Sequence, residues 1–235
     1  MRRREKMQKK ENAVSTGISI REIKRLGKEK FQRNNEQCIL AELVPALVQI
    51  GILILSLFFR WNKAIMFILL LISVAAGILF EIGQTEFYIE NSQGKASWKK
   101  ILCPFSMAGY GMMETVLMKY AIAILYGLLL VIPGIIRGYS YGMVDYIVVS
   151  DKDYDWAKTL KDSRQIMNGH KKEYFKFRLS FYPLFIVSLF TFGIMYVLYV
   201  GPYFHQSRIE LLENIRKEKN ILSTESKEAG YHNHG

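Results

Sequence analysis

The chain of 235 residues is half hydrophobic, and its 32 Lys and Arg against 21 Asp and Glu give a formal net charge of +11 at pH 7. Long runs without charge alternate with strongly basic segments, which excludes a disordered chain and disfavours a small soluble globule. Cys38 and Cys103 stand alone at the edges of apolar runs, so the sequence predicts neither a disulfide framework nor a zinc site.

The first 37 residues form a hydrophilic segment with 12 Lys and Arg against 5 Glu. Ser19 and Glu22 have the spacing of a capping box, which predicts that a helix begins there. Apolar side chains would fall on one face of this helix and basic side chains elsewhere (Ile20, Ile23, Leu26 and Phe31 against Arg21, Lys24, Arg25 and Lys28). Such a helix is typical of an anionic membrane surface, although an ordinary solvated helix has the same pattern.

Two charge-free runs, Leu43–Phe59 and Ala64–Phe80, predict two membrane-spanning helices. Each run has 17 residues, and the flanking residues extend it toward the roughly 20 that a crossing needs. The intervening segment Arg60–Lys63 is long enough for a tight turn between antiparallel helices. Trp61 in this turn fits the aromatic belt of a membrane surface.

A second pair of spans is predicted on either side of Pro133 and Gly134, because this dipeptide kinks or turns a helix. Met112–Ile132 would cross outward, and Ile135–Ser150 would return. In the polar segment that follows, one face of a helix would carry the more apolar side chains (Trp156, Leu160, Ser163 and Met167), which predicts a second interfacial amphipathic helix.

The third predicted pair of spans is Glu173–Phe190 and Ile194–Gln206, joined by a turn at Gly193. With only four crossings, the segment Gly138–Arg178 with its eight Lys and Arg would lie outside, against the positive-inside rule. Six crossings place almost every basic residue inside. The sequence therefore predicts an all-α, polytopic helical membrane protein with six spans, four of them strongly marked, and both termini in the cytoplasm.

This topology divides the chain into three parts. Residues 1–37 are the basic cytoplasmic segment with its amphipathic helix, 38–212 the helical membrane domain, and 213–235 a polar cytoplasmic tail. The expected location is the cell membrane.

Charged residues inside a predicted span are candidates for function because a charge in the bilayer is costly. Arg137 and Asp145 both lie in the fourth predicted span, but eight helical residues separate them by about 80° and ~12 Å, so they cannot pair. The alternative is interfacial anchoring, with Arg137 at the outer surface and Asp145 near the inner one, or a bond between helices. Six tyrosines of the returning helices form interhelical hydrogen bonds, an interfacial belt or a ligand-facing wall (Tyr139, Tyr141, Tyr146, Tyr196, Tyr199 and Tyr203).

Three basic residues near the start of the fifth predicted span, Arg164, Lys171 and Lys172, are candidate contacts for lipid phosphates. The alternative is simple helix termination combined with inside-positive charge. No HExxH, GxSxG or Walker pattern occurs, so we expect a protein that is not an enzyme and needs no cofactor or metal. The cytoplasmic location of the charge explains it without nucleic-acid binding.

The segments Ile132–Asp151 and Ser163–Phe181 resemble a family of bacterial integral membrane proteins catalogued as domain of unknown function 975, and the resemblance covers roughly residues 18 to 218. The chain departs from that family's pattern where Lys152 and Asp153 replace Asn-Pro and where Arg178 replaces an acidic residue. The resemblance implies an all-helical membrane protein and no established activity.

We therefore expect a membrane protein that binds membrane lipids or a protein partner, which could be a second copy of the chain. The alternative is a small transporter or exporter component, favoured by Asp145 and by the paired broken segments.

Overall fold

The computed structural model describes residues 19–94, 96–105, 109–129, 131–152 and 155–231. Over these ranges every regular element is helical and none is a strand, which confirms the predicted all-α class. In chain order the elements are α2 (Ile20–Arg33), α3 (Asn35–Phe58), α4 (Lys63–Gln93), the 3₁₀ helix η1 (Trp98–Phe105), α5 (Gly109–Leu129), α6 (Val131–Ser140), α7 (Val144–Asp151), α8 (Trp156–Ile166), α9 (Lys171–Leu179), α10 (Tyr182–Phe190), the π-helix η2 (Tyr196–Val200) and α11 (Gly201–Tyr231).

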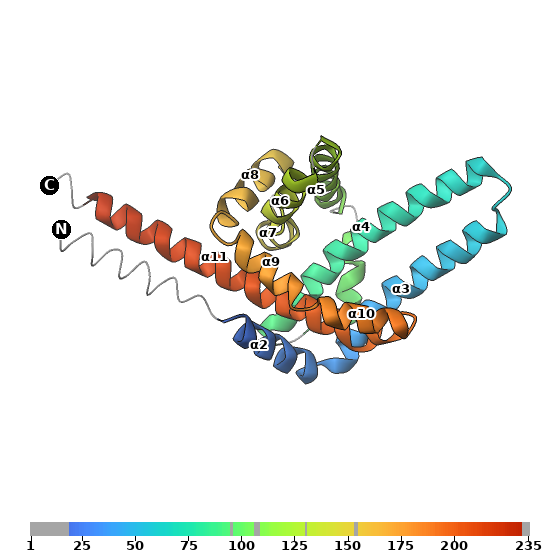
Figure 1. Ribbon diagram of the computed structural model, residues 1–235, viewed down its shortest axis with the longest axis horizontal. Helices are drawn as coiled ribbons and strands as arrows, with labels where there is room; N and C mark the ends of the chain where they lie inside the picture. Colours follow the sequence, from blue (N-terminus) through green and yellow to red (C-terminus); the bar gives the residue numbers. More distant parts are fainter. Residues whose placement is uncertain (1–18, 95, 106–108, 130, 153–154, 232–235) are drawn as a thin grey trace.

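Helices α3 and α4 form a long hairpin that projects from the rest of the molecule (Figure 1). Asn62 begins α4 by accepting hydrogen bonds from the amides of Ala64 and Ile65, as an N-cap does. With 24 and 31 residues, α3 and α4 measure about 36 and 46 Å at ~1.5 Å per residue, more than a ~30 Å hydrocarbon core. Both are long and apolar enough to cross a membrane, and only 17% and 22% of the most apolar 18-residue segment of α3 and of α4, respectively, is buried.

The long helix α11 runs away from this hairpin, and α2 lies along it (Figure 1). Ile23 and Phe31 of α2 are buried there rather than presented to a membrane surface, so the predicted interfacial role of the apolar stripe was wrong. The close approach of the two helices requires Gly27, because a Cβ at this position would lie 2.2 Å from the Ser207 hydroxyl oxygen. Ser19 does cap α2, but its hydroxyl accepts from the Arg21 amide instead of completing the predicted capping box.

The second predicted interfacial helix, α8, also directs its apolar face into the protein. Leu160, Ser163 and Met167 are buried, and only Trp156 at its start keeps 37% of its surface exposed. An amphipathic pattern does not reveal whether the apolar face contacts lipid or protein. In both α2 and α8 the apolar face is buried against the rest of the protein.

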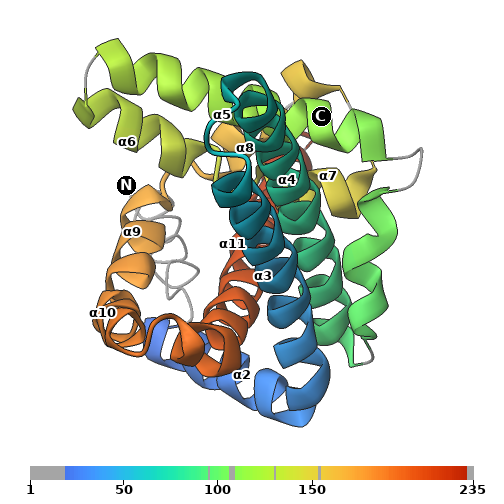
Figure 2. The ribbon, with the colours of Figure 1, turned by 90° about the vertical axis from the view of Figure 1, so that its right-hand side faces the viewer.

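Helices α5 and α6 form a second hairpin, which lies across the direction of α3–α4: Figure 1 shows it nearly end-on and Figure 2 shows it from the side. The predicted turn at Pro133 and Gly134 was wrong, because α6 already begins at Val131. Proline is tolerated in the first turn of a helix, where its missing N–H has no partner to lose. The side chains of residues 127–135 are outside the described part of the chain.

The predicted span Glu173–Phe190 is broken into two helices, since α9 ends at Leu179 and α10 begins at Tyr182. The nine residues of α10 measure about 14 Å. The chain then reverses where Gly193 has a φ of 82°, and η2 leads back into α11. Helix α11 runs without a break through residue 213, so the proposed start of a separate tail lies inside a continuous helix.

The α2–α11 contact gives a testable prediction. Gly27→Ala should lower the stability by about 1–3 kcal/mol, because the new methyl group overlaps Ser207 on the neighbouring helix. Gly51→Ala is the matched control: it lies within α3 with no atom within 4 Å of a new Cβ, so helix propensity alone should leave the stability unchanged or slightly raised. Thermal unfolding of both variants in detergent measures the difference, and equal midpoints would contradict the close packing.

Candidate functional site

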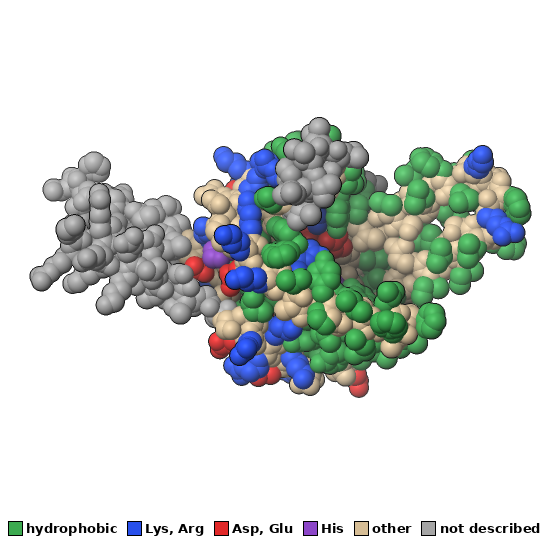
Figure 3. Space-filling view, viewed as in Figure 1, with side chains coloured by type: hydrophobic (Ala, Val, Ile, Leu, Met, Phe, Trp, Pro, Cys, Tyr) green, Lys and Arg blue, Asp and Glu red, His purple; other side chains and the backbone are tan. Residues whose placement is uncertain are grey.

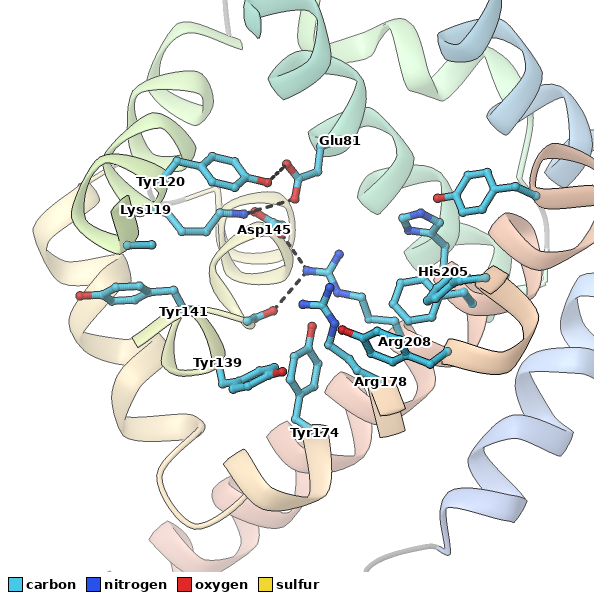
Figure 4. Close-up of a pocket in the computed structure, with 17 residues that line it drawn as sticks. Glu81, Lys119, Tyr120, Tyr139, Tyr141, Asp145, Tyr174, Arg178, His205 and Arg208 are labelled. Atoms are coloured by element: carbon cyan, nitrogen blue, oxygen red, sulfur yellow. Dashed lines mark hydrogen bonds and ion pairs between the residues drawn. The ribbon is translucent and has the colours of Figure 1, made fainter. Parts of the chain in front are cut away.

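A cavity of about 610 Å³ lies between the bases of the helical hairpins, within the usual size range of ligand sites. Its walls come from α4, α5, α6, α7 and the connection between the last two, α9, α10, η2 and α11 (Figure 4). Figure 3 shows acidic and basic side chains together in the hollow beside the apolar hairpin. The polar lining residues are Glu81, Lys119, Tyr120, Asp145, Arg178, His205 and Arg208, and the aromatic ones include Tyr139, Tyr141, Tyr174, Tyr182, Phe185, Tyr196 and Phe204.

Asp145 is the centre of the charged side of this cavity, and none of its surface is exposed. The Lys119 ammonium lies 2.6 Å from Oδ1, and the Arg208 guanidinium donates to Oδ2 over 2.8 Å. The three side chains come from α7, α5 and α11, which are distant in the sequence. A buried carboxylate with a cation on each oxygen is strongly held, because loss of either cation leaves a charge without compensation.

Glu81 of α4 extends this cluster. Lys119 reaches its Oε1 over 3.3 Å, and the Tyr120 hydroxyl donates to Oε2 over 2.5 Å. Two carboxylates (Glu81 and Asp145) and two cations (Lys119 and Arg208) therefore compensate one another, and the cluster is neutral as a whole. It connects α4, α5, α7 and α11 across the base of the hairpins.

The short helix α7 brings Asp145 to this position because most of the helix is buried. Val144, Ile147 and Val148 are buried beside Asp145, whereas Asp151 at the end of the same helix is exposed. At Gly142, just before α7, a Cβ would lie 3.2 Å from the Tyr174 ring, and the Gly142 carbonyl accepts a further hydrogen bond from Arg208 at 3.3 Å.

Two arginines face the cavity differently. Arg208 is held by Asp145, but its Nε is buried without a hydrogen-bond partner among the described residues. Burial lowers the pKa of Arg208, while Tyr174, Asp145 and Glu81 raise it by more, so the pKa lies above its ordinary value and the group stays charged. Arg178, at the end of α9, is exposed, and the part of the chain that the structure describes offers it no ion pair or hydrogen bond.

A second polar cluster lies directly behind the cavity. Glu42 of α3 is buried and accepts hydrogen bonds from Tyr88 at 2.8 Å and Gln84 at 3.1 Å. His205 connects the two regions, because its ring lines the cavity, stacks on Tyr88 at 5.5 Å and has Nε2 at 3.9 Å from the Glu42 carboxylate.

Of the residues selected from the sequence, Asp145 is central and Arg137 is not in the cluster. The Arg137 guanidinium lies over the Tyr126 ring at 4.6 Å, between α6 and α5. The two predicted intramembrane charges thus make separate contacts, each with other partners. Tyr139, Tyr141 and Tyr196 line the cavity, as the ligand-facing alternative for the tyrosines would require.

The predicted lipid-phosphate contacts lie outside the cavity. Arg164 is exposed near the end of α8 with its guanidinium 5.3 Å from the Tyr141 ring centre. Lys172 is exposed and Lys171 half-buried in the first turn of α9. Contact with lipid phosphate stays a prediction for all three.

Sequence reasoning missed Lys119, Arg178 and Arg208 as members of one site. Lys119 had a usable signal, since it is a charge inside the apolar run Met112–Ile132, the criterion that selected Asp145. Arg178 and Arg208 stand in polar surroundings in the sequence, and only the tertiary fold brings them to this cavity. Within the described ranges, no group of three or more His, Cys, Asp or Glu is arranged to hold a metal ion.

Over the described residues, the fold and the site together define an all-helical protein with one membrane-length hairpin and a charged, aromatic cavity at the base of its hairpins. Comparison with family models then gives a match over residues 30–219 to the family described as "Protein of unknown function (DUF975)", and the chain belongs to this family. Comparisons with curated proteins and with solved structures give no match.

The ion cluster predicts a large difference between two aspartates. Asp145→Asn leaves Lys119 and Arg208 buried with too little negative charge, so the stability should fall by about 3–5 kcal/mol. Asp151→Asn is the control: it also removes a carboxylate of α7 that pairs with an arginine, Arg216 at 2.6 Å, but this pair is exposed and contributes at most about 1 kcal/mol.

Thermal unfolding of the purified variants in detergent tests this. Asp145→Asn should lower the midpoint by roughly 10 °C, and Asp151→Asn by about 3 °C or less. Similar midpoints for the two variants would show that the buried cluster does not hold the helices together.

Proposed function

We propose that this protein is a polytopic protein of the bacterial cell membrane that binds lipid at its cytoplasmic side and has no catalytic machinery of its own. The exposed apolar surface of the α3–α4 hairpin is the observation that carries the proposal. In water this surface would be unfavourable, and acyl chains are the solvent that suits it. Its exposed large hydrophobic residues are Leu47, Val48, Ile50, Leu53, Ile54, Leu55, Leu57, Phe58, Trp61, Met66, Phe67, Ile68, Leu70, Leu71, Ile72 and Val74.

The distribution of basic residues supports an orientation with both termini in the cytoplasm. Exposed Lys and Arg gather on α2, α8 and α9 at the base of the hairpins, and Figure 3 shows this basic side opposite the apolar hairpin. The turn at the far end carries only Arg60 and Lys63. The positive-inside rule places the basic side in the cytoplasm.

The two shorter hairpins have a different relation to the bilayer in this proposal. Helix α10 measures about 14 Å, less than half of a ~30 Å core, and α5–α6 lies across the direction of α3–α4. We place α3–α4 through the membrane and the other two hairpins in its cytoplasmic leaflet. The six crossings predicted from the sequence are the competing topology, with the same cytoplasmic termini.

Lipid binding is favoured over transport by what surrounds the cavity. Exposed apolar side chains of α10, Ile186, Leu189 and Phe190, lie on the hairpin whose base forms one cavity wall. Asp145, the residue that motivated the transporter alternative, is fixed between Lys119 and Arg208 and serves as a structural charge.

Labelling of single cysteines in intact cells distinguishes the two topologies. In a background with Cys38→Ala and Cys103→Ala, a membrane-impermeant maleimide should label Trp61→Cys from outside and Lys172→Cys only after permeabilisation. Phe192→Cys should react under neither condition until the membrane is dissolved, because the tip of the α10 hairpin lies in the leaflet. Labelling of Phe192→Cys from outside would establish the six-crossing topology instead.

Purification tests the lipid-binding part. Full-length protein extracted in a mild detergent should retain phospholipid after size-exclusion chromatography, as native mass spectrometry measures directly. If the protein stays in the supernatant after ultracentrifugation of a detergent-free lysate, membrane insertion is contradicted. If the protein is folded and inserted but retains no lipid, only lipid binding is contradicted.

A further inference from the structure

The charge balance of the cavity leaves one positive charge without a counterpart. Glu81, Lys119, Asp145 and Arg208 compensate one another through contacts of 2.6 to 3.3 Å. Arg178 lines the same cavity, and no described residue pairs with it. Two carboxylates against three cations give this cavity a surplus of +1, so an anion would complete it.

The geometry of the two arginines agrees with an anionic ligand. Figure 4 shows the guanidinium groups of Arg178 and Arg208 both directed into the cavity. Arg208 keeps a buried Nε without a hydrogen-bond partner, and a buried donor of this kind is rare in a native structure. A planar guanidinium presents several donors that match the oxygens of a phosphate or carboxylate group.

Part of the cavity wall is aromatic and belongs to the hairpin that the proposed function places in the membrane. Tyr182 and Phe185 of α10 and Tyr196 of η2 line it, and the outer face of the same hairpin exposes Ile186 and Leu189. A ligand with an anionic group at the arginines and an apolar body along the aromatic wall fits both sides. At the cytoplasmic boundary of a bilayer, the abundant anionic group is the phosphodiester of lipid headgroups.

From these observations we infer that the cavity is an anion site that binds a phosphate ester, with Arg178 as its primary contact and the Arg208 guanidinium as a second donor. The inference rests on the proposed membrane location, which puts phospholipid headgroups beside the cavity. An anionic phospholipid and a soluble phosphate ester share this chemistry, and the apolar wall favours the lipid.

Binding to the delipidated full-length protein tests the inference, with native mass spectrometry as the readout and three probes. Phosphatidylglycerol supplies phosphate and acyl chains, diacylglycerol supplies the chains alone, and glycerol 3-phosphate supplies the phosphate alone. Arg178→Gln should weaken phosphatidylglycerol binding about tenfold, as expected for loss of a charge-assisted hydrogen bond. Arg178→Lys should restore part of it, because the charge returns without the planar guanidinium.

Lys176→Gln is the matched control, since it removes an exposed positive charge from the same helix, outside the cavity lining. It should bind phosphatidylglycerol as the wild-type chain does, and diacylglycerol should bind weakly to all variants. If glycerol 3-phosphate at equal concentration displaces phosphatidylglycerol and this displacement depends on Arg178, the ligand is a soluble phosphate ester. If glycerol 3-phosphate does not displace phosphatidylglycerol, the ligand is the lipid.

Equal phosphatidylglycerol binding by Arg178→Gln and Lys176→Gln would overturn the inference, as would diacylglycerol binding as tight as that of phosphatidylglycerol. Either result would leave the proposed function intact, because membrane insertion and total retained lipid do not depend on Arg178. Unfolding midpoints of the variants serve as the folding control, since Arg178 is exposed and makes no described contact that stabilises the fold.

Discussion

The carboxylate of Asp145 is the contact on which the arrangement of the helices around the cavity depends. It holds Lys119 of α5 at 2.6 Å and Arg208 of α11 at 2.8 Å, and Lys119 continues to Glu81 of α4. Ionised groups can be buried in this way only when each has a counter-charge in good geometry. Their exact pairing therefore fixes which faces of α4, α5, α7 and α11 meet, which general apolar packing leaves open.

A second set of contacts supports this arrangement where α2, α4 and α11 meet. Asn91 of α4 donates to Gln206 of α11 at 2.6 Å, Gln206 donates to Glu210, and Glu210 pairs with Lys30 of α2 at 2.6 Å. Together with the close approach of Gly27 to α11, these contacts make α2, α4 and α11 one frame. The apolar hairpin α3–α4 extends from this frame. The continuous helix α4 therefore connects the apolar surface of the hairpin to the polar contacts of the frame.

The sequence predicted the helical class and the α3–α4 hairpin and selected Asp145 as a candidate, because each depends on a local pattern. Charge-free runs and the short segment Arg60–Lys63 are enough to locate a hairpin. Which surface meets an amphipathic face is not local information, and for that reason α2 and α8 were assigned to a membrane surface when their apolar faces pack on the protein. The break between Leu179 and Tyr182 did have a local signal that the prediction passed over, because Pro183 lies inside the predicted span and an interior proline interrupts a helix.

For the charged residues of the cavity too, local patterns were predictable from the sequence and tertiary contacts were not. A lysine or aspartate inside an apolar run can be recognised from the sequence, but its partner cannot, because Asp145 is 63 residues from Arg208 and 26 from Lys119. Only the fold reveals that four of the charges compensate one another and that Arg178 has no counter-charge among the described residues. The frame needs the four compensated charges to hold its helices together, whereas the fifth contributes nothing to that frame. A positive charge that the fold does not use, at the wall of a cavity beside exposed apolar helices, is therefore the feature most directly available for binding.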